Sequence, residues 1–444
     1  MLKRTSYLLL LLLAASCGSR QQVQHVSPRV DVQPLAPVTV PMPVVTVVEE
    51  EPEAAEPVVS AQPLVSQVHR APEGSWQCEK QRALDSLCLS PIFETTQVGI
   101  YVYDLTEGQP LYAVNAAQRM RPASCQKVVT AVTALHCLKS DFCLRTEFRT
   151  TGNVVNGSLQ GNLIVVGGMD PLVTPDELLQ AAAAIKSQQG IQTIAGKVIY
   201  DCSMREDAPY GWGWCWDDDY GPLSALMVDG KDGFELKWQE AMVKAGIKVQ
   251  DPPQPSPKGR EQKGTVVYSI RHDLDELLFP MMKESNNIYA ECLFYQTAAT
   301  SGKKGAGRKE TAMRTDNLLK SIGLNPDEYK VADGSGLSLY NYVSAEMLVA
   351  LLGYAWQTPR IKEHLLPSLP IAGYDGTLQK RMIGTPAEGN VQAKTGTVTG
   401  ISSLAGYINA ANGHTLAFAI INQGVSSAAI GRTFQDKVCI ELAK

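Results

Sequence analysis

Residues 121–130 read RPASCQKVVT, which places Ser124 and Lys127 three residues apart at the start of an apolar run. Apolar residues recur at helical spacing over 123–138, and Pro122 stands where a helix can begin. Positions i and i+3 share one face of a helix, so we expect the lysine amine to lie beside the serine hydroxyl. Burial would lower the lysine pKa from its usual value of about 10.4 and make the neutral amine available as a base.

An isolated Ser-x-x-Lys motif is a weak signal, and the chain contains a second copy, Ser301/Lys304, in the stretch SGKKGAGRK. We interpret that second stretch as a solvated loop. Taken alone, Ser124 fits a helix N-cap as well as it fits a nucleophile. A serine at a helix N-terminus also has free backbone N–H groups nearby, which can stabilise an oxyanion.

The flanking sequence predicts a sheet with helices. Residues 98–115 read as two β-rich runs around a turn, and 391–424 read as three β-rich runs followed by a last helix. Strands at both ends of the chain with helices between them indicate an α+β sheet whose edge strands come from distant parts of the chain. Between these ends we predict a strand breaking into a glycine turn (161–171), a glycine-stopped helix (177–190), an irregular tract (209–222) and helix (275–299).

Two further motifs follow Ser-x-x-Lys along the chain. Residues 285–287 read SNN between helical stretches, and residues 394–397 read KTGT at the start of the C-terminal β-rich section. The order Ser-x-x-Lys, Ser-x-Asn, Lys-Thr-Gly is typical of penicillin-binding proteins and class A β-lactamases. Three motifs in this order favour an acyl-transfer site over three separate structural features.

The chain resembles the bacterial D-alanyl-D-alanine carboxypeptidases/endopeptidases, the low-molecular-mass class C penicillin-binding proteins. Similar stretches outside the motifs are GNLIVVGGMDP, WCWDDDYGPLSAL, DGSGLSLYN and LPIAGYDGTLQKR. The resemblance implies an α+β, penicillin-binding/β-lactamase-like transpeptidase domain, with an antiparallel sheet flanked by helices. It places the catalytic domain at 73–147 and 268–444 and an inserted accessory domain at 148–267. Only about 160 residues separate the first two motifs, so we expect the insertion to be reduced or absent.

The resemblance also assigns roles to individual side chains. The reaction it implies is acylation of a serine by a D-Ala-D-Ala terminus, followed by hydrolysis. The backbone N–H groups of Ser124 and Thr397 would form the oxyanion hole. The implied catalytic residues are Ser124, Lys127, Ser285 and Lys394, and the implied substrate-binding residues are Asn287, Thr395, Gly396 and Thr397.

The N-terminus, MLKRTSYLLLLLLAASCGSR, has two basic residues before a short apolar run that ends in small residues and Cys17. This pattern predicts a secretory signal over 1–17. LAASC resembles the lipobox of bacterial lipoproteins, which makes Cys17 a lipidation site and the protein a periplasmic, membrane-anchored lipoprotein; the alternative is an ordinary signal peptide. Residues 18–72 are rich in Pro, Val and Glu and predict a disordered tether, or a tail without a spacing role.

Composition excludes several classes of partner. The net charge is −5 and no basic cluster stands out, so we expect no nucleic-acid partner. The six histidines are scattered and no Cys-x-x-Cys occurs, so we expect neither a metal site nor a cofactor. In an exported protein some cysteines can pair, and the local pairs are Cys78/Cys88, Cys137/Cys143 and Cys202/Cys215.

The expected partners are peptidoglycan stem peptides as substrates and β-lactam antibiotics as covalent inhibitors. Terminal D-alanine removal and cross-bridge cleavage present the same carbonyl, so the sequence does not separate carboxypeptidase from endopeptidase. A histidine-based serine hydrolase is disfavoured because Gly-x-Ser-x-Gly is absent and no histidine falls in a motif. A serine β-lactamase and a non-catalytic peptidoglycan-binding lipoprotein of the same fold are the two alternatives.

Overall fold

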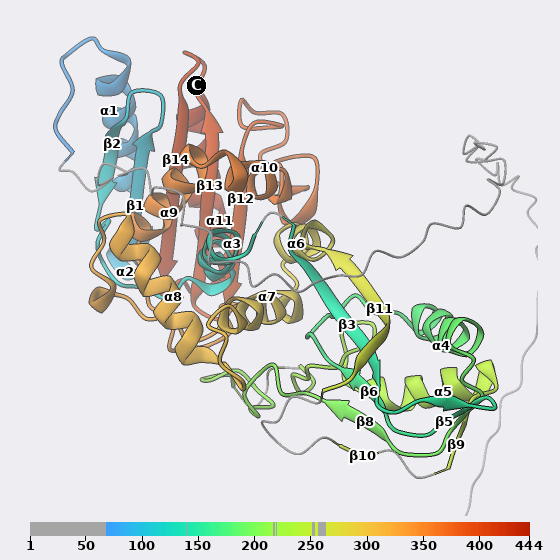
Figure 1. The fold of residues 1–444 in the computed structure, drawn as a ribbon. Coiled ribbons are helices and arrows are strands. Elements are labelled where there is room, and N and C mark those ends of the chain that lie inside the picture. Colours follow the sequence, from blue (N-terminus) through green and yellow to red (C-terminus); the bar gives the residue numbers. More distant parts are fainter. Residues whose placement is uncertain (1–67, 140, 216–217, 219, 251–253, 256–262) are drawn as a thin grey trace, which may run out of the picture. The chain divides into compact units, whose positions relative to one another are not determined.

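The computed structural model describes residues 68–444 apart from 140, 216–217, 219, 251–253 and 256–262 (Figure 1). The predicted signal, Cys17 and all but the last residues of the predicted tether (18–72) lie outside this described part of the chain. In the described part no helix is both long and apolar enough to cross a membrane.

A five-stranded sheet joins the two ends of the described chain. Its order is β12-β13-β14-β1-β2, and each neighbouring pair is antiparallel. The predicted N-terminal hairpin and the three predicted C-terminal strands are therefore confirmed, as are edge strands from distant parts of the chain. The bounds are β1 Gln97–Asp104, β2 Gln109–Val114, β12 Gln392–Val398, β13 Ile401–Asn409 and β14 Thr415–Gln423.

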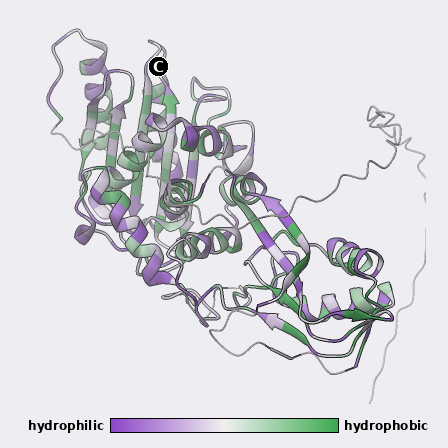
Figure 2. Ribbon diagram, in the orientation of Figure 1, coloured by the Kyte–Doolittle hydropathy of each residue, from purple (hydrophilic) through white to green (hydrophobic). Residues whose placement is uncertain are grey.

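Helices cover both faces of this sheet. Successive side chains of a strand point to opposite faces, so Tyr101 and Tyr103 pack with α3 (Gln126–Cys137) and α9 (Ala345–Gln357). Ile100 and Val102 pack on the other face, whose apolar core also includes side chains of the helices α1 Trp76–Cys88, α2 Ile92–Thr95 and α11 Ala428–Ala443. Two-sided burial explains the near-continuous hydrophobic strands, which appear green in Figure 2.

The predicted helical run over 275–299 is two helices, α6 (Leu274–Lys283) and α7 (Asn287–Ala299). The break falls at Ser285, which has a φ of 63°, in the left-handed region that non-glycine residues seldom adopt. Asn286 then caps α7, because its side chain accepts a hydrogen bond from the Tyr289 N–H. The remaining helices here are η1 Ala123–Cys125, α8 Arg308–Ser321, η2 Pro326–Glu328, α10 Pro359–Ser368 and η3 Gly376–Leu378.

Residues 143–273 form two further sheets, β10-β8-β6-β3-β11 and β4-β5-β7-β9, with an apolar core of their own. Helix α4 (Pro175–Gln189) ends at Gly190, whose φ is 69°, as the glycine stop predicts. A second helix, α5 (Phe234–Ala245), packs against α4. The strands are β3 Cys143–Thr150, β4 Val154–Val155, β5 Ser158–Leu159, β6 Leu163–Val166, β7 Thr193–Ile194, β8 Val198–Asp201, β9 Lys248–Val249, β10 Gln254–Pro255 and β11 Thr265–Asp273.

The cysteine pairing predicted from spacing is wrong for this structure, because every described cysteine is a free thiol. Cys78 and Cys88 lie ten residues apart on α1, which separates them by about 15 Å along the axis, twice the reach of a disulfide. Cys143, predicted to pair with Cys137, instead accepts a hydrogen bond on Sγ from Arg145 Nε at 3.1 Å. Cys202 and Cys215 are also unpaired with each other.

Candidate active site

Ser124 lies in the short 3₁₀ turn η1 that leads directly into α3, and Lys127 lies in the first turn of α3. Lys127 Nζ is 3.0 Å from Ser124 Oγ. The lysine is 0% exposed, although its charged group would normally seek water. The contact predicted from the i, i+3 spacing is therefore present, and it is buried.

Lys127 Nζ has two other partners, Asn287 Oδ1 at 2.6 Å and the Ser335 carbonyl at 2.8 Å. Both are acceptors only in these contacts, so they take N–H groups from the lysine. A neutral amine has two N–H groups and one lone pair. With both N–H groups engaged, the lone pair of a neutral Lys127 is directed at the Ser124 hydroxyl.

The pKa of Lys127 lies well below its ordinary value. Burial is the largest cause, because desolvation disfavours the ammonium, and the positive charge of Lys394 acts in the same direction. Asp333 and Glu291 oppose the shift without cancelling it. The environment therefore favours the neutral amine that a general base requires.

A second serine–lysine pair is formed by Ser285 and Lys394. Lys394 Nζ donates to Ser285 Oγ at 2.9 Å and to the Thr395 carbonyl at 2.7 Å. Lys394 is 0% exposed on β12, and burial lowers its pKa to about 8. The left-handed backbone at Ser285 turns the chain between α6 and α7 at the point where this contact forms.

The edge strand β12 lies directly against the turn that carries Ser124. A Cβ added to Gly396 would lie 2.6 Å from the Pro122 carbonyl oxygen and 2.9 Å from the Cys125 nitrogen. Cys125 Sγ also donates to the Lys394 carbonyl at 3.2 Å. Only glycine fits at position 396 at this distance, which accounts for the glycine of the Lys-Thr-Gly motif.

The two threonines of the 394–397 stretch have different partners. Thr395 Oγ1 donates to Thr377 Oγ1 at 2.8 Å, whereas Thr397 is exposed and its Oγ1 accepts from Arg432 Nη2 at 3.4 Å. Both hydroxyls belong to the strand that carries Lys394, so they extend the polar surface beyond the two serine–lysine pairs.

Three members of the site were not identified individually from the sequence. They are the Ser335 carbonyl on Lys127, the Tyr220 hydroxyl, which accepts from Asn287 Nδ2 at 2.6 Å, and Thr377. Each lies in one of the stretches quoted above for the family resemblance, and that was the available signal. A backbone carbonyl has no side-chain identity that a motif search can detect.

The second Ser-x-x-Lys copy differs from the first. Ser301 follows the end of α7, and its Oγ accepts from the Lys303 N–H at 3.3 Å. The turn that follows Ser301 is the solvated loop predicted from composition, and its Lys303 and Lys304 are exposed. This copy provides a control for the first.

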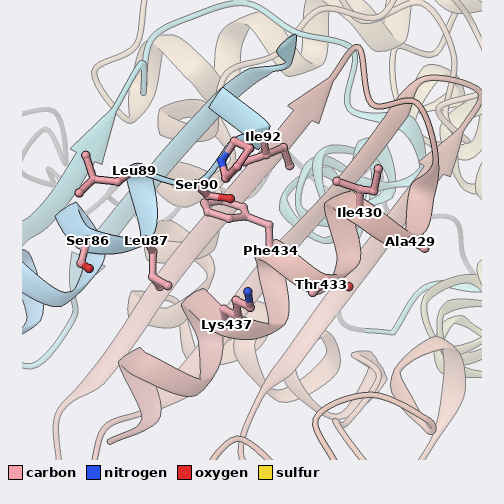
Figure 3. A pocket seen from close by; sticks show the side chains of 11 residues that line it. Ser86, Leu87, Leu89, Ser90, Ile92, Ala429, Ile430, Thr433, Phe434 and Lys437 are labelled. Carbon is pink, nitrogen blue, oxygen red and sulfur yellow. The ribbon is translucent and has the colours of Figure 1, made fainter. Parts of the chain in front are cut away.

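A surface pocket lies away from the candidate site residues. Figure 3 shows it between the end of α1, α2 and α11, with Leu89, Ile92, Ile430 and Phe434 among its lining side chains. Ile92 and Phe434 belong to the core on the α1 and α11 face of the five-stranded sheet, whereas Lys127 lies on α3, on the opposite face. No predicted site residue lines this pocket.

Within the described ranges, no group of three or more His, Cys, Asp or Glu side chains is placed to hold a metal ion. The buried polar groups of the site are instead satisfied by one another. The arrangement supports serine nucleophilic catalysis with lysine bases.

The sequence profile of the D-Ala-D-Ala carboxypeptidase 3 (S13) family matches residues 80–234 and 232–443. The chain belongs to this family. Among curated proteins it is 27% identical over 417 residues to the D-alanyl-D-alanine carboxypeptidase DacB of Haemophilus influenzae, covering 75% of this chain and 87% of that one. It is also 27% identical to the D-alanyl-D-alanine carboxypeptidase of Actinomadura sp. (strain R39), covering 84% of this chain and 86% of that one.

Solved structures agree with the family. Penicillin binding protein 4 of H. influenzae superimposes with a TM-score of 0.72 at 25% identity, covering 81% of this chain and 98% of that one. The same protein complexed with a β-lactam gives a TM-score of 0.69 at 27% identity, with coverage of 82% and 99%. A predatory endopeptidase from Bdellovibrio bacteriovorus shares the fold at a TM-score of 0.53 and 18% identity, covering 77% and 91%. The predicted α+β, penicillin-binding-protein fold is confirmed.

Proposed function

We propose that this member of the family is a serine-type D-Ala-D-Ala peptidase in which Ser124 is the nucleophile and Lys127 its general base. The observation that carries the proposal is the buried contact of 3.0 Å between Lys127 Nζ and Ser124 Oγ, with both remaining lysine contacts made to acceptors. A lysine with a lowered pKa can hold its lone pair on the hydroxyl at a lower pH than an ordinary lysine can. The substrate class is the peptidoglycan stem peptide.

In the acylation step, Ser124 Oγ attacks the carbonyl of the penultimate D-alanine while its proton passes to Lys127 Nζ. The backbone N–H groups of Ser124 and Thr397 stabilise the oxyanion. Collapse of the tetrahedral intermediate breaks the peptide bond, and the departing amine takes a proton from Ser285, which Lys394 replaces. Water then attacks the acyl-enzyme: its hydroxyl joins the acyl carbon and its proton restores the Ser124 hydroxyl. Transfer of a proton from the Lys127 ammonium to Lys394 returns both lysines to their starting states. The 2.9 Å contact between Lys394 and Ser285 supports this proton route.

Four substrate-binding residues, together with the catalytic Lys394, hold the substrate in this proposal. Asn287 Oδ1 is occupied by Lys127, so its Nδ2, which now contacts Tyr220, is the atom available to a substrate carbonyl. Because Gly396 has no side chain, the backbone of the substrate can approach β12 closely. Thr395 and Thr397, together with the Lys394 ammonium, bind the terminal carboxylate.

Thr397→Val is expected to lower kcat/KM for a D-Ala-D-Ala peptide by about ten- to a hundredfold, because one hydrogen bond to a charged group is lost. The measurement is hydrolysis of the free-acid peptide and of its amide by both proteins. The amide lacks the carboxylate, so both proteins should hydrolyse it poorly and with a much smaller difference. Thr265→Val, at an exposed position of β11, is the matched control and should behave like the wild type. Equal losses on both substrates would remove the carboxylate-binding role.

We further propose that the protein is exported and anchored in a membrane through a lipid on Cys17, with the catalytic residues in the periplasm. The supporting observations are the basic, apolar and small-residue order of residues 1–17 and the Pro-rich stretch that follows. Anchoring and tether would give the enzyme access to peptidoglycan near the membrane.

Cys17→Ala is expected to move the protein from the membrane fraction to the soluble fraction without changing its specific activity, since the change removes only the lipid attachment point. Fractionation followed by immunoblotting and an activity assay measures both properties. Continued membrane association of the variant would contradict lipid anchoring and would indicate that the apolar N-terminus is retained.

The two alternatives give different results with purified protein. A serine β-lactamase would turn over nitrocefin repeatedly, whereas a peptidase of this kind becomes acylated and stays inhibited. A non-catalytic peptidoglycan-binding protein would neither react with nitrocefin nor release D-alanine.

Digestion of purified sacculi, with mass analysis of the muropeptides, tests the proposed activity and divides it into two reactions. Loss of terminal D-alanine indicates a carboxypeptidase, and conversion of cross-linked dimers to monomers indicates an endopeptidase. Sacculi left unchanged by the wild-type protein, under conditions in which a known peptidase acts, would contradict the proposal.

A further inference from the structure

Two of the three contacts of Lys127 depend on side chains of helix α7. Asn287, at the start of α7, contacts the lysine directly through Oδ1 at 2.6 Å. Glu291 lies one turn further along the same helix, and residues four apart share a face. Glu291 is 1% exposed although it carries a carboxyl group, so its position in the core requires hydrogen-bond partners.

Those partners are backbone N–H groups beneath the catalytic lysine. Glu291 Oε1 accepts from the Ser335 N–H at 2.8 Å and from the Gly334 N–H at 3.1 Å. The carbonyl of the same residue, Ser335, accepts from Lys127 Nζ at 2.8 Å. Ser335 therefore connects the two side chains through its backbone, and moving Glu291 would move the acceptor that orients the lysine.

The loop that contains Gly334 and Ser335 is held closely against α7. A Cβ on Gly334 would lie 2.4 Å from the Ala290 carbonyl oxygen and 2.7 Å from Phe294 Cβ, so the loop backbone touches the helix. On the other side, Thr130 Oγ1 of α3 donates to the Gly334 carbonyl at 2.7 Å. The loop thus lies between the helix that carries the base and the helix that carries Glu291.

A second buried carboxylate, Asp333, holds the remainder of the loop. It is 1% exposed, and it contacts side chains as well as backbone. Its five donors are Trp214 Nε1, the Ser335 hydroxyl, the Gly336 and Ser338 N–H groups and Asn341 Nδ2. Asp333 thereby folds the loop, and Glu291 sets the position of the one carbonyl that meets Lys127.

We propose that Glu291 is a positioning residue for the general base, which acts by accepting the Ser335 and Gly334 N–H groups and so fixing the Ser335 carbonyl on Lys127. This inference rests on the proposed function. What it requires of Glu291 is an oxygen acceptor rather than a negative charge. Burial, followed by the charge of Asp333, raises the pKa of Glu291 to about 8, which favours the neutral carboxyl.

Glutamine is a close mimic of the neutral carboxyl that the raised pKa of Glu291 favours. Glu291→Gln keeps a neutral oxygen acceptor on a side chain of the same length. Glu291→Leu has a side chain of similar volume but no acceptor, so the Ser335 and Gly334 N–H groups lose their partner. The titratable groups that face Lys127 are Lys394 from β12, Asp333 from the loop, Glu291 from α7 and the Cys125 thiol from η1. Of these, each variant changes only Glu291.

The test is the rate of acylation by benzylpenicillin between pH 5 and pH 9, normalised to the fraction of protein that can be labelled. Glu291→Leu should lose about ten- to a hundredfold at the plateau, since a displaced base is badly oriented. The acidic limb of its pH–rate profile, where the rate rises with pH, should also move to lower pH. Loss of the Ser335 carbonyl as an acceptor destabilises the Lys127 ammonium and so lowers the pKa of Lys127. Glu291→Gln should stay within about threefold of the wild type and keep its acidic limb.

A role confined to folding would reduce the labelled fraction but would leave the normalised rate and the acidic limb in place, and that result would overturn the proposal. Equal losses in the Gln and Leu variants would also overturn it, because charge would then matter more than the acceptor. If Glu291→Leu does not fold, Glu291→Asp withdraws the acceptor by one methylene and should show the same two changes. A wild-type protein that is not acylated would overturn the proposed function itself, and with it this inference.

Discussion

Ser124→Ala is expected to abolish covalent labelling by fluorescent penicillin and to reduce D-alanine release to the background rate. The change removes one half-buried hydroxyl from η1 and leaves the apolar contacts of α3 intact, so the thermal unfolding midpoint should change little. Gel fluorescence of equal amounts of protein measures the labelling. The expected loss is complete because no other group on the chain is proposed to form the acyl-enzyme.

Ser301→Ala is the matched control, since it makes the same chemical change in the other Ser-x-x-Lys copy. It should label at the wild-type level. Labelling of Ser124→Ala at the wild-type stoichiometry, or loss of labelling in Ser301→Ala alone, would show that the nucleophile has been assigned to the wrong serine.

Lys127→Met is expected to lower the acylation rate by about 10²- to 10⁴-fold, the usual contribution of a general base. Methionine fills most of the buried volume of the lysine stem without the amine. In the wild type the rate should rise with pH as Lys127 loses its proton, at a pH well below the ordinary lysine pKa because burial lowers that pKa. This rise should be absent from the variant. Stopped-flow measurement of acylation over a pH series gives both quantities.

Lys304→Met provides the corresponding control in the exposed loop and should keep the wild-type rate and pH dependence. A Lys127→Met protein that folds and retains the wild-type acidic limb would show that another group accepts the serine proton. Lys394, whose pKa is about 8, would then be the next candidate.

Local sequence patterns predicted much of the fold. Periodicity and turn residues located the N-terminal hairpin, helix α3, helix α4 with its Gly190 stop, and the three C-terminal strands. These features are encoded over a few neighbouring residues. The break at Ser285 is different: its left-handed backbone lies where its side chain contacts Lys394 of β12, and no local pattern contains that contact.

The candidate site was predicted in part. The Ser124 and Lys127 contact follows from helical spacing, whereas the contact of Lys394 with Ser285 was expected only through the family resemblance. The contact of Lys127 with Asn287 was not predicted. The roles of the Ser335 carbonyl, Tyr220 and Glu291 depend on how distant segments meet, so residue type alone did not indicate them. Cysteine spacing misled for the same reason, since it carries no information about distance in the fold.

The central claim is that a single serine, Ser124, carries the acyl group, and peptide mapping tests it most directly. The purified protein is incubated with benzylpenicillin, digested under conditions that preserve the ester, and sequenced by tandem mass spectrometry. We predict one adduct per chain, located on the peptide that contains Ser124. An adduct on the peptide containing Ser285 or Ser301, or no adduct on an otherwise folded protein, would contradict it.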